Sequence, residues 1–273
     1  MTIPVAFSIA GSDPSGGAGI QADLKTFHQR EVYGAAAVTL LTVQNTCRVS
    51  AVETLSPDIV EAQARAVIDD ITPDAAKTGA LGSEEIVRRL GQIADDFRFP
   101  LVVDPVMISK HGHALLTESA RRALKEDLLP KAYLVTPNLP EAEELANMEV
   151  RDLAEMKEAA KKIASLGARA VLVKGGHLEG EAVDVLYCNG ETICLRAPRF
   201  STRHTHGTGC TYSACITAEL AKGRALNDAV ATAKEFITRA IETAPGLGQG
   251  YGPVNHFAQI QQVWSAGVSP ANY

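Results

Sequence analysis

The strongest chemical signal in the sequence is a glycine-rich segment that immediately precedes a helix-forming run. Residues 204–211 read HTHGTGCT, and the helix-forming run continues to about Lys222. Glycines just before a helix leave backbone N–H groups free to converge on an anion, and the helix dipole adds partial positive charge there. Gly207, Thr208 and Gly209 are therefore expected to stabilise a developing phosphoryl or oxyanion charge.

Cys210 is expected at the start of the same helix. A thiol in that position usually has a pKa below its reference value of about 8.5, so it could act as an acid, a base or a hydrogen-bond partner. The alternative is an inert buried cysteine, which is what we expect for Cys215. His204 and His206 are not expected to bind a metal, because no third ligand is found near them in the sequence.

Four further polar segments each follow an expected strand. They are residues 11–19 (GSDPSGGAG), 104–113 (DPVMISKHGH), 136–143 (TPNLPEAE) and 174–177 (KGGH). Active sites of open α/β sheets lie at the carboxyl ends of the strands. We therefore expect these segments and residues 204–211 to meet at one edge of the sheet.

Three of these segments carry charged side chains that suit phosphate chemistry. Asp104 could hold a hydrated magnesium ion. Asn138 and Glu141 are three residues apart and could face one site, although helix capping alone would also explain them. Lys174 ends its strand, where a lysine either reaches solvent or meets the same site. An anion pocket, a cation and two carboxylates, without the order of a catalytic triad, predict a small-molecule kinase or ligase that uses a nucleotide.

The glycine-rich segment near the N-terminus also matches a dinucleotide-binding pattern. Residues 17–22 read GAGIQA, which fits G-x-G-x-x-A. The match begins seven residues past the expected strand, and no acidic residue follows about 20 positions later. No Gly-Lys-Ser/Thr closes the loop, so it is not a Walker A motif either. We interpret the pattern as a chance match, and a dinucleotide-dependent oxidoreductase as a weak alternative.

Short β-rich runs alternate with helix-period segments along almost the whole chain, which is typical of a mostly parallel sheet covered by helices. The expected fold class is therefore α/β. No linker divides the chain, so residues 1–262 are expected to form one domain, followed by a tail over residues 263–273. The expected strands are residues 5–10, 36–43, 101–106, 133–136 and 170–174, followed by an antiparallel hairpin of residues 183–188 and 192–195.

The composition excludes several classes of protein. The 273 residues include 26 Lys plus Arg and 32 Asp plus Glu, which gives a formal charge of −6. No clustered basic surface for a nucleic acid is expected. No run approaches the ~18 apolar residues of a membrane span, and no basic residue precedes the apolar N-terminal stretch, so we expect a cytoplasmic protein. The five cysteines lack Cys-x-x-Cys spacing, which argues against a disulfide framework and a zinc site.

The sequence resembles the ribokinase-like kinases, which share an Asn-x-x-Glu element and a Gly-Thr-Gly anion loop. Within that superfamily it is similar to the hydroxymethylpyrimidine/phosphomethylpyrimidine kinases of thiamine biosynthesis. The matching motifs cover all but about the last fifteen residues. They are residues 9–13 (IAGSD), 16–26 (GGAGIQADLKT), 44–46 (QNT), 77–79 (KTG), 104–107 (DPVM), 136–142 (TPNLPEA), 174–177 (KGGH), 205–211 (THGTGCT) and 252–257 (GPVNHF).

The resemblance implies a three-layer α/β/α fold, the cofactors ATP and Mg²⁺, and a homodimer. It implies two successive phosphorylations, first of 4-amino-5-hydroxymethyl-2-methylpyrimidine and then of its monophosphate. It places Gly11, Asp23, Gln44, Ala80, Met107 and Lys110 around the substrate, with Gln44 hydrogen-bonded to the pyrimidine. It assigns the anion hole to Gly207, Thr208, Gly209 and Cys210, ATP binding to Asn138, Lys174 and Thr208, and the magnesium ion to Asp104 and Glu141.

Two residues depart from the pattern of related kinases. Many relatives carry a bulky Met at the position of Ala80, so a roomier pocket and a second substrate such as pyridoxal are alternatives. Sugar-kinase relatives carry Asp where Cys210 stands, and a thiol is the poorer general base. The alternative functions of this sequence are a pyridoxal kinase of the same superfamily and, in a different class, a catalytically inactive nucleotide-binding regulator.

Overall fold

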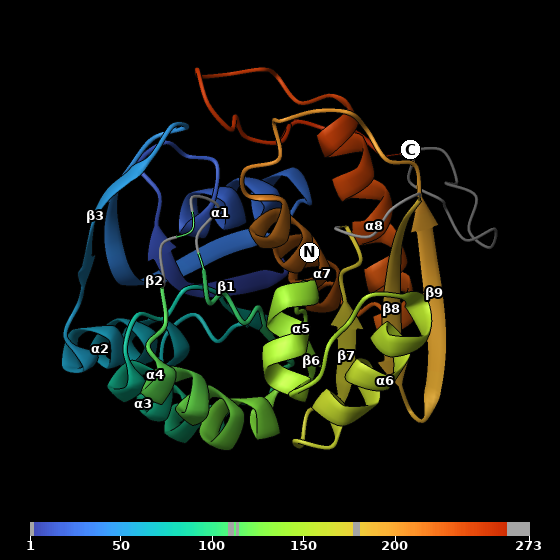
Figure 1. Ribbon diagram of the computed structural model, residues 1–273. Coiled ribbons are helices and arrows are strands. Elements are labelled where there is room, and N and C mark those ends of the chain that lie inside the picture. The colour runs from blue at the N-terminus through green and yellow to red at the C-terminus, as the bar shows by residue number, and fades with distance from the viewer. Residues whose placement is uncertain (1–2, 109–111, 113–114, 177–180, 261–273) are drawn as a thin grey trace, which may run out of the picture.

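The computed structural model describes residues 3–108, 112, 115–176 and 181–260. Within this part of the chain, nine strands form one sheet in the order β3-β2-β1-β4-β5-β6-β7-β8-β9 (Figure 1). The strands are β1 (Val5–Ser12), β2 (Tyr33–Gln44), β3 (Val49–Thr54), β4 (Ala75–Thr78), β5 (Leu101–Val103), β6 (Leu134–Val135), β7 (Ala170–Val173), β8 (Ala182–Cys188) and β9 (Glu191–Ala197).

Six adjacent strands of the sheet, β2, β1, β4, β5, β6 and β7, are parallel to one another. β3 at one edge and the β8–β9 hairpin at the other pair in antiparallel fashion. This confirms the expected α/β class with a mostly parallel sheet and a small hairpin. In the hairpin, Val185 lies opposite Cys194 and Cys188 opposite Glu191, as a two-residue turn requires. All five cysteines are free.

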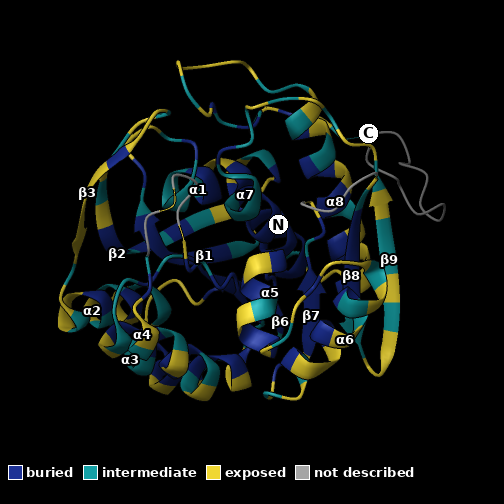
Figure 2. Cartoon of the chain, viewed as in Figure 1, coloured by how far each residue is buried: buried dark blue, intermediate teal, exposed yellow. Residues whose placement is uncertain are grey.

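Helices cover both faces of the sheet and give three layers (Figures 1 and 2). Because side chains alternate along a strand, Val102 packs in one core and Val103 in the other. One core contains residues of α1 (Gly19–Gln29), α7 (Thr208–Ala221) and α8 (Leu226–Glu242), and the other contains residues of α2 (Pro57–Ile68), α3 (Glu84–Ala94), α4 (Glu118–Ala123), α5 (Leu139–Ala146) and α6 (Leu153–Ala164).

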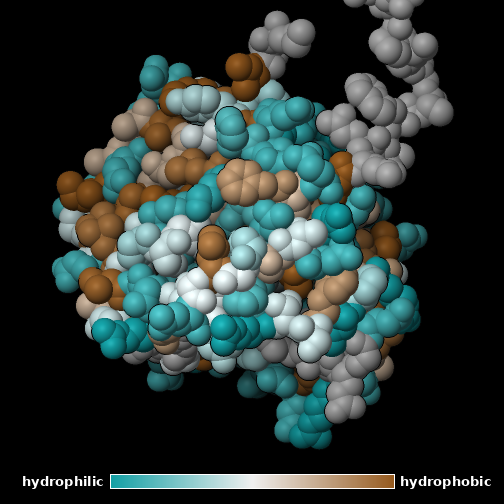
Figure 3. Space-filling view, turned by 90° about the horizontal axis from the view of Figure 1, so that it is seen from above, coloured by the Kyte–Doolittle hydropathy of each residue, from teal (hydrophilic) through white to brown (hydrophobic). Residues whose placement is uncertain are grey.

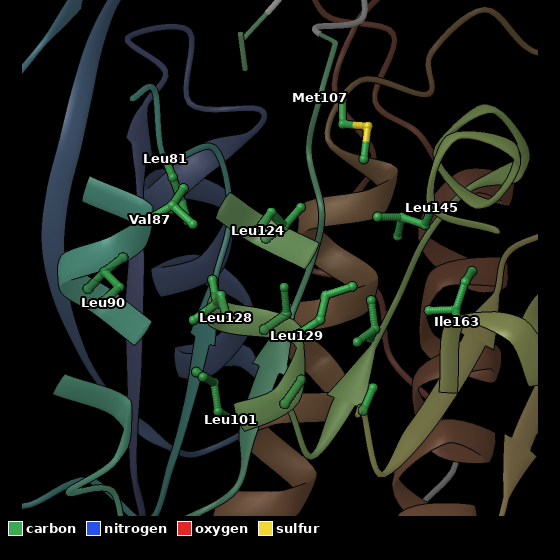
Figure 4. Packing of buried hydrophobic residues seen from close by; sticks show 14 of the residues in the cluster. Leu81, Val87, Leu90, Leu101, Met107, Leu124, Leu128, Leu129, Leu145 and Ile163 are labelled. Atoms are coloured by element: carbon green, nitrogen blue, oxygen red, sulfur yellow. The ribbon is translucent and has the colours of Figure 1, made fainter. Parts of the chain in front are cut away.

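The second core is closed by leucines from two short helical turns that follow α4. These are the π-helical turn η1 (Leu124–Leu128) and the 3₁₀ turn η2 (Leu129–Lys131). Leu124, Leu128 and Leu129 point into the cluster together with Leu90 and Leu101 (Figure 4). Met107 belongs to the same cluster and also lines the cavity described below, so the core supports one wall of that cavity.

Local sequence signals explain where several helices begin. The side chains of Ser56, Ser83, Asn138 and Asp152 each accept a backbone N–H from the first turn of the helix that follows. Such capping satisfies N–H groups that have no partner inside the helix. At the start of α2, Pro57 follows the capping Ser56 at the first helical position, where its missing N–H costs no hydrogen bond.

Two strands were not expected from the sequence. β4 contains Lys77, whose ammonium group is fully buried because it pairs with Asp23, so the strand does not read as a buried apolar run. β3 is mostly exposed and lies at the edge of the sheet, where burial does not select apolar residues. The expected boundary at residue 262 and the tail lie outside the described residues. In the described part of the chain, no helix combines the length and apolar character that crossing a membrane requires.

Candidate active site

A cavity of about 760 Å³ lies at the carboxyl ends of the parallel strands, within the size range of small-molecule sites. All five chemistry-bearing segments reach it, as expected from their places after strands. Its lining includes Gly11, Asp13, Gly19, Gln44, Ala80, Asp104, Met107, Asn138, Glu141, Lys174 and residues 207–210. Lys110 and His177 lie outside the described residues.

The start of α7 has the geometry of an anion site. Gly207 is its N-cap, with φ of 77°, and a Cβ there would lie 1.7 Å from the Gly17 carbonyl oxygen. Within the described chain, no side chain caps this helix. A Cβ added to Gly209 would lie 3.4 Å from Lys174 Nζ, so the helix start and the lysine face the same volume. This helix start is thus left without a side-chain cap among the described residues, as an anion site would need, and the binding of an anion there stays a prediction.

Lys174 and Asp104 form an ion pair beside this helix start, with 3.0 Å between Nζ and Oδ1. Thr136 Oγ1 donates to Asp104 Oδ1 at 3.2 Å, and Ser213 Oγ donates to Oδ2 at 3.1 Å. Burial acts to raise the pKa of Asp104, but the ammonium groups of Lys174 and Lys77 outweigh it and hold that pKa below its ordinary value. Asp104 is therefore ionised at neutral pH, and Lys174 reaches the cavity rather than open solvent.

Glu141 is both a helix-capping residue and a cavity residue. Asn138 Oδ1 accepts the Glu141 N–H at 2.9 Å, and Glu141 Oε2 accepts the Asn138 N–H at 2.8 Å, which completes a capping box. The capping interpretation is thus correct without excluding a role at the site. Burial, reinforced by the charge of Asp104 and opposed by Lys174, raises the pKa of Glu141 to about 7.

A magnesium ion fits these two carboxylates. No group of three or more His, Cys, Asp or Glu residues with metal-binding geometry occurs among the described residues. Mg²⁺ usually keeps several waters and is held by one or two carboxylates together with phosphate oxygens. Asp104 and Glu141 supply that number, and a bound cation would offset the burial, reinforced by the charge of Asp104, that raises the pKa of Glu141.

The expected low pKa of Cys210 is wrong. Burial raises the pKa of this thiol to about 11, and the charge of Lys77 only partly opposes the effect. The position at a helix start is as expected, but desolvation outweighs the positive charge of Lys77. Cys210 is a neutral thiol at physiological pH. Cys215 is fully buried with its pKa raised to about 12, as expected for an inert cysteine.

The residues expected around the substrate are only partly brought together. Gly11, Gln44, Ala80 and Met107 line the cavity. Asp23 does not line it, because its carboxylate is fully buried and accepts hydrogen bonds from Lys77 Nζ at 2.8 Å and Ser8 Oγ at 2.6 Å. In this structure Asp23 lies behind the wall of the cavity.

Asp13 is a site residue that the sequence analysis did not single out. Its carboxylate accepts the N–H groups of Ser15, Gly17 and Ala18 at 2.8–3.1 Å, and it lies 2.8 Å from His206 Nε2. The same His206 atom is 3.0 Å from Gln44 Nε2. The first two amides of the supposed dinucleotide motif, those of Gly17 and Ala18, are thus bonded to Asp13. The sequence signal for this role is that Asp13 stands two residues before Ser15 in a glycine-rich segment, where an aspartate side chain commonly accepts a backbone N–H of the turn.

The fold and the site together define a ribokinase-like protein. The family model described as phosphomethylpyrimidine kinase matches residues 13–255, and the chain belongs to that family. A hydroxymethylpyrimidine/phosphomethylpyrimidine kinase of Haemophilus influenzae is 48% identical over 257 residues, covering 92% of this chain and 96% of that protein. One from Bacillus subtilis is 42% identical over 261 residues, covering 94% and 96%.

Solved structures show the same architecture. An ADP complex of a Bacillus subtilis pyridoxal kinase has a TM-score of 0.88 to this chain at 42% identity, covering 94% of this chain and 98% of that one. A phosphomethylpyrimidine kinase of Clostridium difficile has a TM-score of 0.78 at 44% identity, covering 88% and 100%. The three-layer fold is therefore shared with kinases described under both substrate names.

Proposed function

We propose that the protein is an ATP-dependent kinase of thiamine biosynthesis. It phosphorylates 4-amino-5-hydroxymethyl-2-methylpyrimidine and then its monophosphate. The observation that carries this proposal is the position of Lys174, Asp104 and the start of α7 at one cavity that also holds Gln44 and Met107. The names of the curated relatives support the choice of substrate.

In this proposal, the nucleotide phosphates bind between Lys174 and the start of α7, near Asn138 and Thr208. A magnesium ion held by Asp104 and Glu141 would neutralise charge on the phosphate oxygens when it is bound. Gly207, Gly209 and Cys210 direct their backbone N–H groups to the transferred group, which is the main catalytic demand of a loose transition state. Thr208 was also expected in this anion hole, but its N–H is bonded to the Thr205 carbonyl oxygen at 3.3 Å.

The neutral thiol of Cys210 suits such a transition state. A group with a pKa of about 11 is a poor base before transfer begins, because the proton already on sulfur must first be lost. In a largely dissociative reaction the acceptor hydroxyl loses its proton late. Cys210 then serves by position and hydrogen bonding, with Gln44 orienting the pyrimidine ring through amide donor and acceptor atoms.

Pyridoxal is a second candidate substrate. Ala80 lines the cavity with a small side chain, and proteins of 38–42% identity that share the fold are described as pyridoxal kinases.

Lys110 is proposed to meet the phosphate of the monophosphate substrate. An inactive regulator is the less favoured candidate, because Lys174, Asp104 and Glu141 are all in place.

We also propose a homodimer in the cytoplasm, with residues 1–262 as the kinase domain and residues 263–273 as a tail. Leu41 and Val43 of β2 and Val52 of β3 are exposed apolar residues at one edge of the sheet. Figure 3 shows residues of high hydropathy on the side of the molecule where β3 lies in Figure 1. The five free cysteines agree with a reducing compartment.

The proposed activity is tested by ADP release from purified protein with ATP and magnesium. Hydroxymethylpyrimidine, its monophosphate and pyridoxal are compared as acceptors, with no acceptor as the control. We expect release with both pyrimidines above the control. Release with pyridoxal alone would assign the second candidate function, and acceptor-independent release alone would contradict both.

A further inference from the structure

A buried charged cluster of residues not discussed so far, Asp184, Tyr212 and Lys234, forms part of the lining of the same cavity. Its centre is Asp184 of β8, which is 3% exposed. Asp184 Oδ2 accepts hydrogen bonds from Lys234 Nζ at 2.7 Å and from the Tyr212 hydroxyl at 3.1 Å, and Oδ1 accepts the Gly175 N–H at 3.0 Å. One carboxylate thus joins α8, α7 and the turn that follows β7.

That turn carries Lys174. It packs closely on β8, since a Cβ added to Gly175 would lie 1.9 Å from the Val183 carbonyl oxygen. Its other hydrogen bonds include the Lys174 N–H bond to the Pro137 oxygen at 2.8 Å and the bond from Arg199 Nη1 to the Gly176 oxygen at 2.6 Å. The Gly175 N–H bond to Asp184 lies between these two attachments and is the buried, charged one.

Tyr212 connects the same carboxylate to the anion-binding helix. It is two residues beyond Cys210 in α7, and its phenol is a neutral donor because burial and Asp184 raise its pKa well above the usual value. Asp184 therefore contacts both the turn of Lys174 and the first part of α7. These are the two elements between which the nucleotide phosphates are proposed to bind.

We propose that Asp184 is a positioning residue that fixes Lys174 relative to the start of α7. The inference rests on the proposed function, because it assumes that Lys174 and α7 bind the nucleotide. A buried ion pair such as Lys234–Asp184 is often replaceable by apolar residues without loss of stability, so stability alone is a weak reason for it. The hydrogen bond to Gly175 gives Asp184 a role that an apolar residue could not fill.

The test is a double-mutant cycle read out by ADP binding in the absence of any pyrimidine. Asp184→Asn is compared with wild type, and Asp184→Asn/Lys174→Met with Lys174→Met, by titration calorimetry below the unfolding temperature. We expect Asp184→Asn to weaken ADP binding about tenfold in wild type. The amide removes the charge that strengthens the bond from Gly175, and its oxygen and NH2 group cannot satisfy the donors of Gly175, Lys234 and Tyr212 together. In the Lys174→Met background we expect less than about a twofold effect, because Asp184 acts through Lys174.

Glu219→Gln is the matched control. Glu219 is also fully buried and ion-paired, with Arg30 at 2.8 Å, but it lies near the opposite end of α7. The substitution Glu219→Gln should lower the unfolding temperature and leave ADP binding unchanged. Equal weakening by Asp184→Asn in both backgrounds, or by Glu219→Gln, would overturn the positioning role. Absence of ADP binding by wild type would instead contradict the proposed function.

Tyr212→Phe keeps the test decisive if Asp184→Asn does not fold. It retains the Lys234–Asp184 pair and removes only the link to α7. We expect about a threefold loss of ADP affinity, because one hydrogen bond to the Asp184 carboxylate is lost while its bonds to Gly175 and Lys234 remain. An unchanged affinity in this variant would contradict the link between Asp184 and the anion-binding helix.

Discussion

Glu141 serves both the local structure of α5 and the proposed chemistry of the site. Its carboxylate completes the capping box of α5, yet burial raises its pKa to about 7. The folded state thus binds a proton more tightly than the unfolded state, whose pKa is the ordinary 4.5. The resulting stability is present below pH 4.5 and is lost as the pH rises through about 7.

Magnesium competes with that proton. We expect the magnesium affinity of the ATP-bound enzyme to rise with pH through about 7, because only the ionised carboxylate serves the metal. The measurement is the magnesium dependence of kcat/KM for ATP on either side of this pH. Glu141→Gln retains the capping box but cannot titrate, so it should weaken magnesium binding and flatten this dependence. An equal pH dependence in both proteins would assign the titration to another group.

Cys210→Ala tests whether the thiol takes part in transfer. We expect turnover to fall by roughly tenfold, less than the ~100-fold typical of a general base. Pyrimidine binding should be retained, because Gln44 and Met107 are untouched. Steady-state kinetics and calorimetric titration with the pyrimidine separate the two effects. Unchanged turnover would remove Cys210 from the mechanism.

At the scale of elements, the anion site depends on the backbone at the start of α7. Gly207→Ala should abolish nucleotide binding, because its Cβ would lie 1.7 Å from the Gly17 carbonyl oxygen and displace the helix start. Gly223→Ala, just beyond the end of α7, is the control. Its φ of 76° matches the 77° of Gly207, but nothing lies within 4 Å of the added Cβ.

The left-handed conformation should cost each variant about 1 kcal/mol of stability, and Gly207→Ala should lose more because of its contact with Gly17. Thermal unfolding and ADP titration of the two proteins make the comparison. Nucleotide binding that survives equally in both variants would contradict an anion site at Gly207.

The carboxyl-edge site could be predicted because each of its segments follows a strand and carries its own local signal. Asn138 and Glu141 are typical of a helix start, and Gly207 and Gly209 are typical of an anion-binding loop. Contacts between distant segments could not be predicted in this way. The burial of Asp23 requires Lys77 of a strand that itself looks polar, and the pKa of Cys210 depends on desolvation that only packing determines.

At the scale of the whole molecule, the two edges of the sheet should differ in their association. Val52 of β3 and Ile193 of β9 are 39% and 38% exposed at opposite edges. We expect Val52→Glu to convert the proposed dimer to monomer and Ile193→Glu to leave it intact, because a buried unpaired charge opposes an interface. Sedimentation velocity of the wild type and of both variants measures whether each is a dimer or a monomer. A monomeric wild type, or dissociation caused only by Ile193→Glu, would contradict the β2–β3 interface.

The central claim is that this cavity transfers the γ-phosphoryl group of ATP to the hydroxymethyl oxygen of the pyrimidine. Its most direct test is mass spectrometry of the pyrimidine during a time course with wild type and with Lys174→Met. The account predicts that wild type forms the monophosphate and then the diphosphate, and that Lys174→Met forms little of either. ADP formation with an unmodified pyrimidine, or equal product from both proteins, would contradict it.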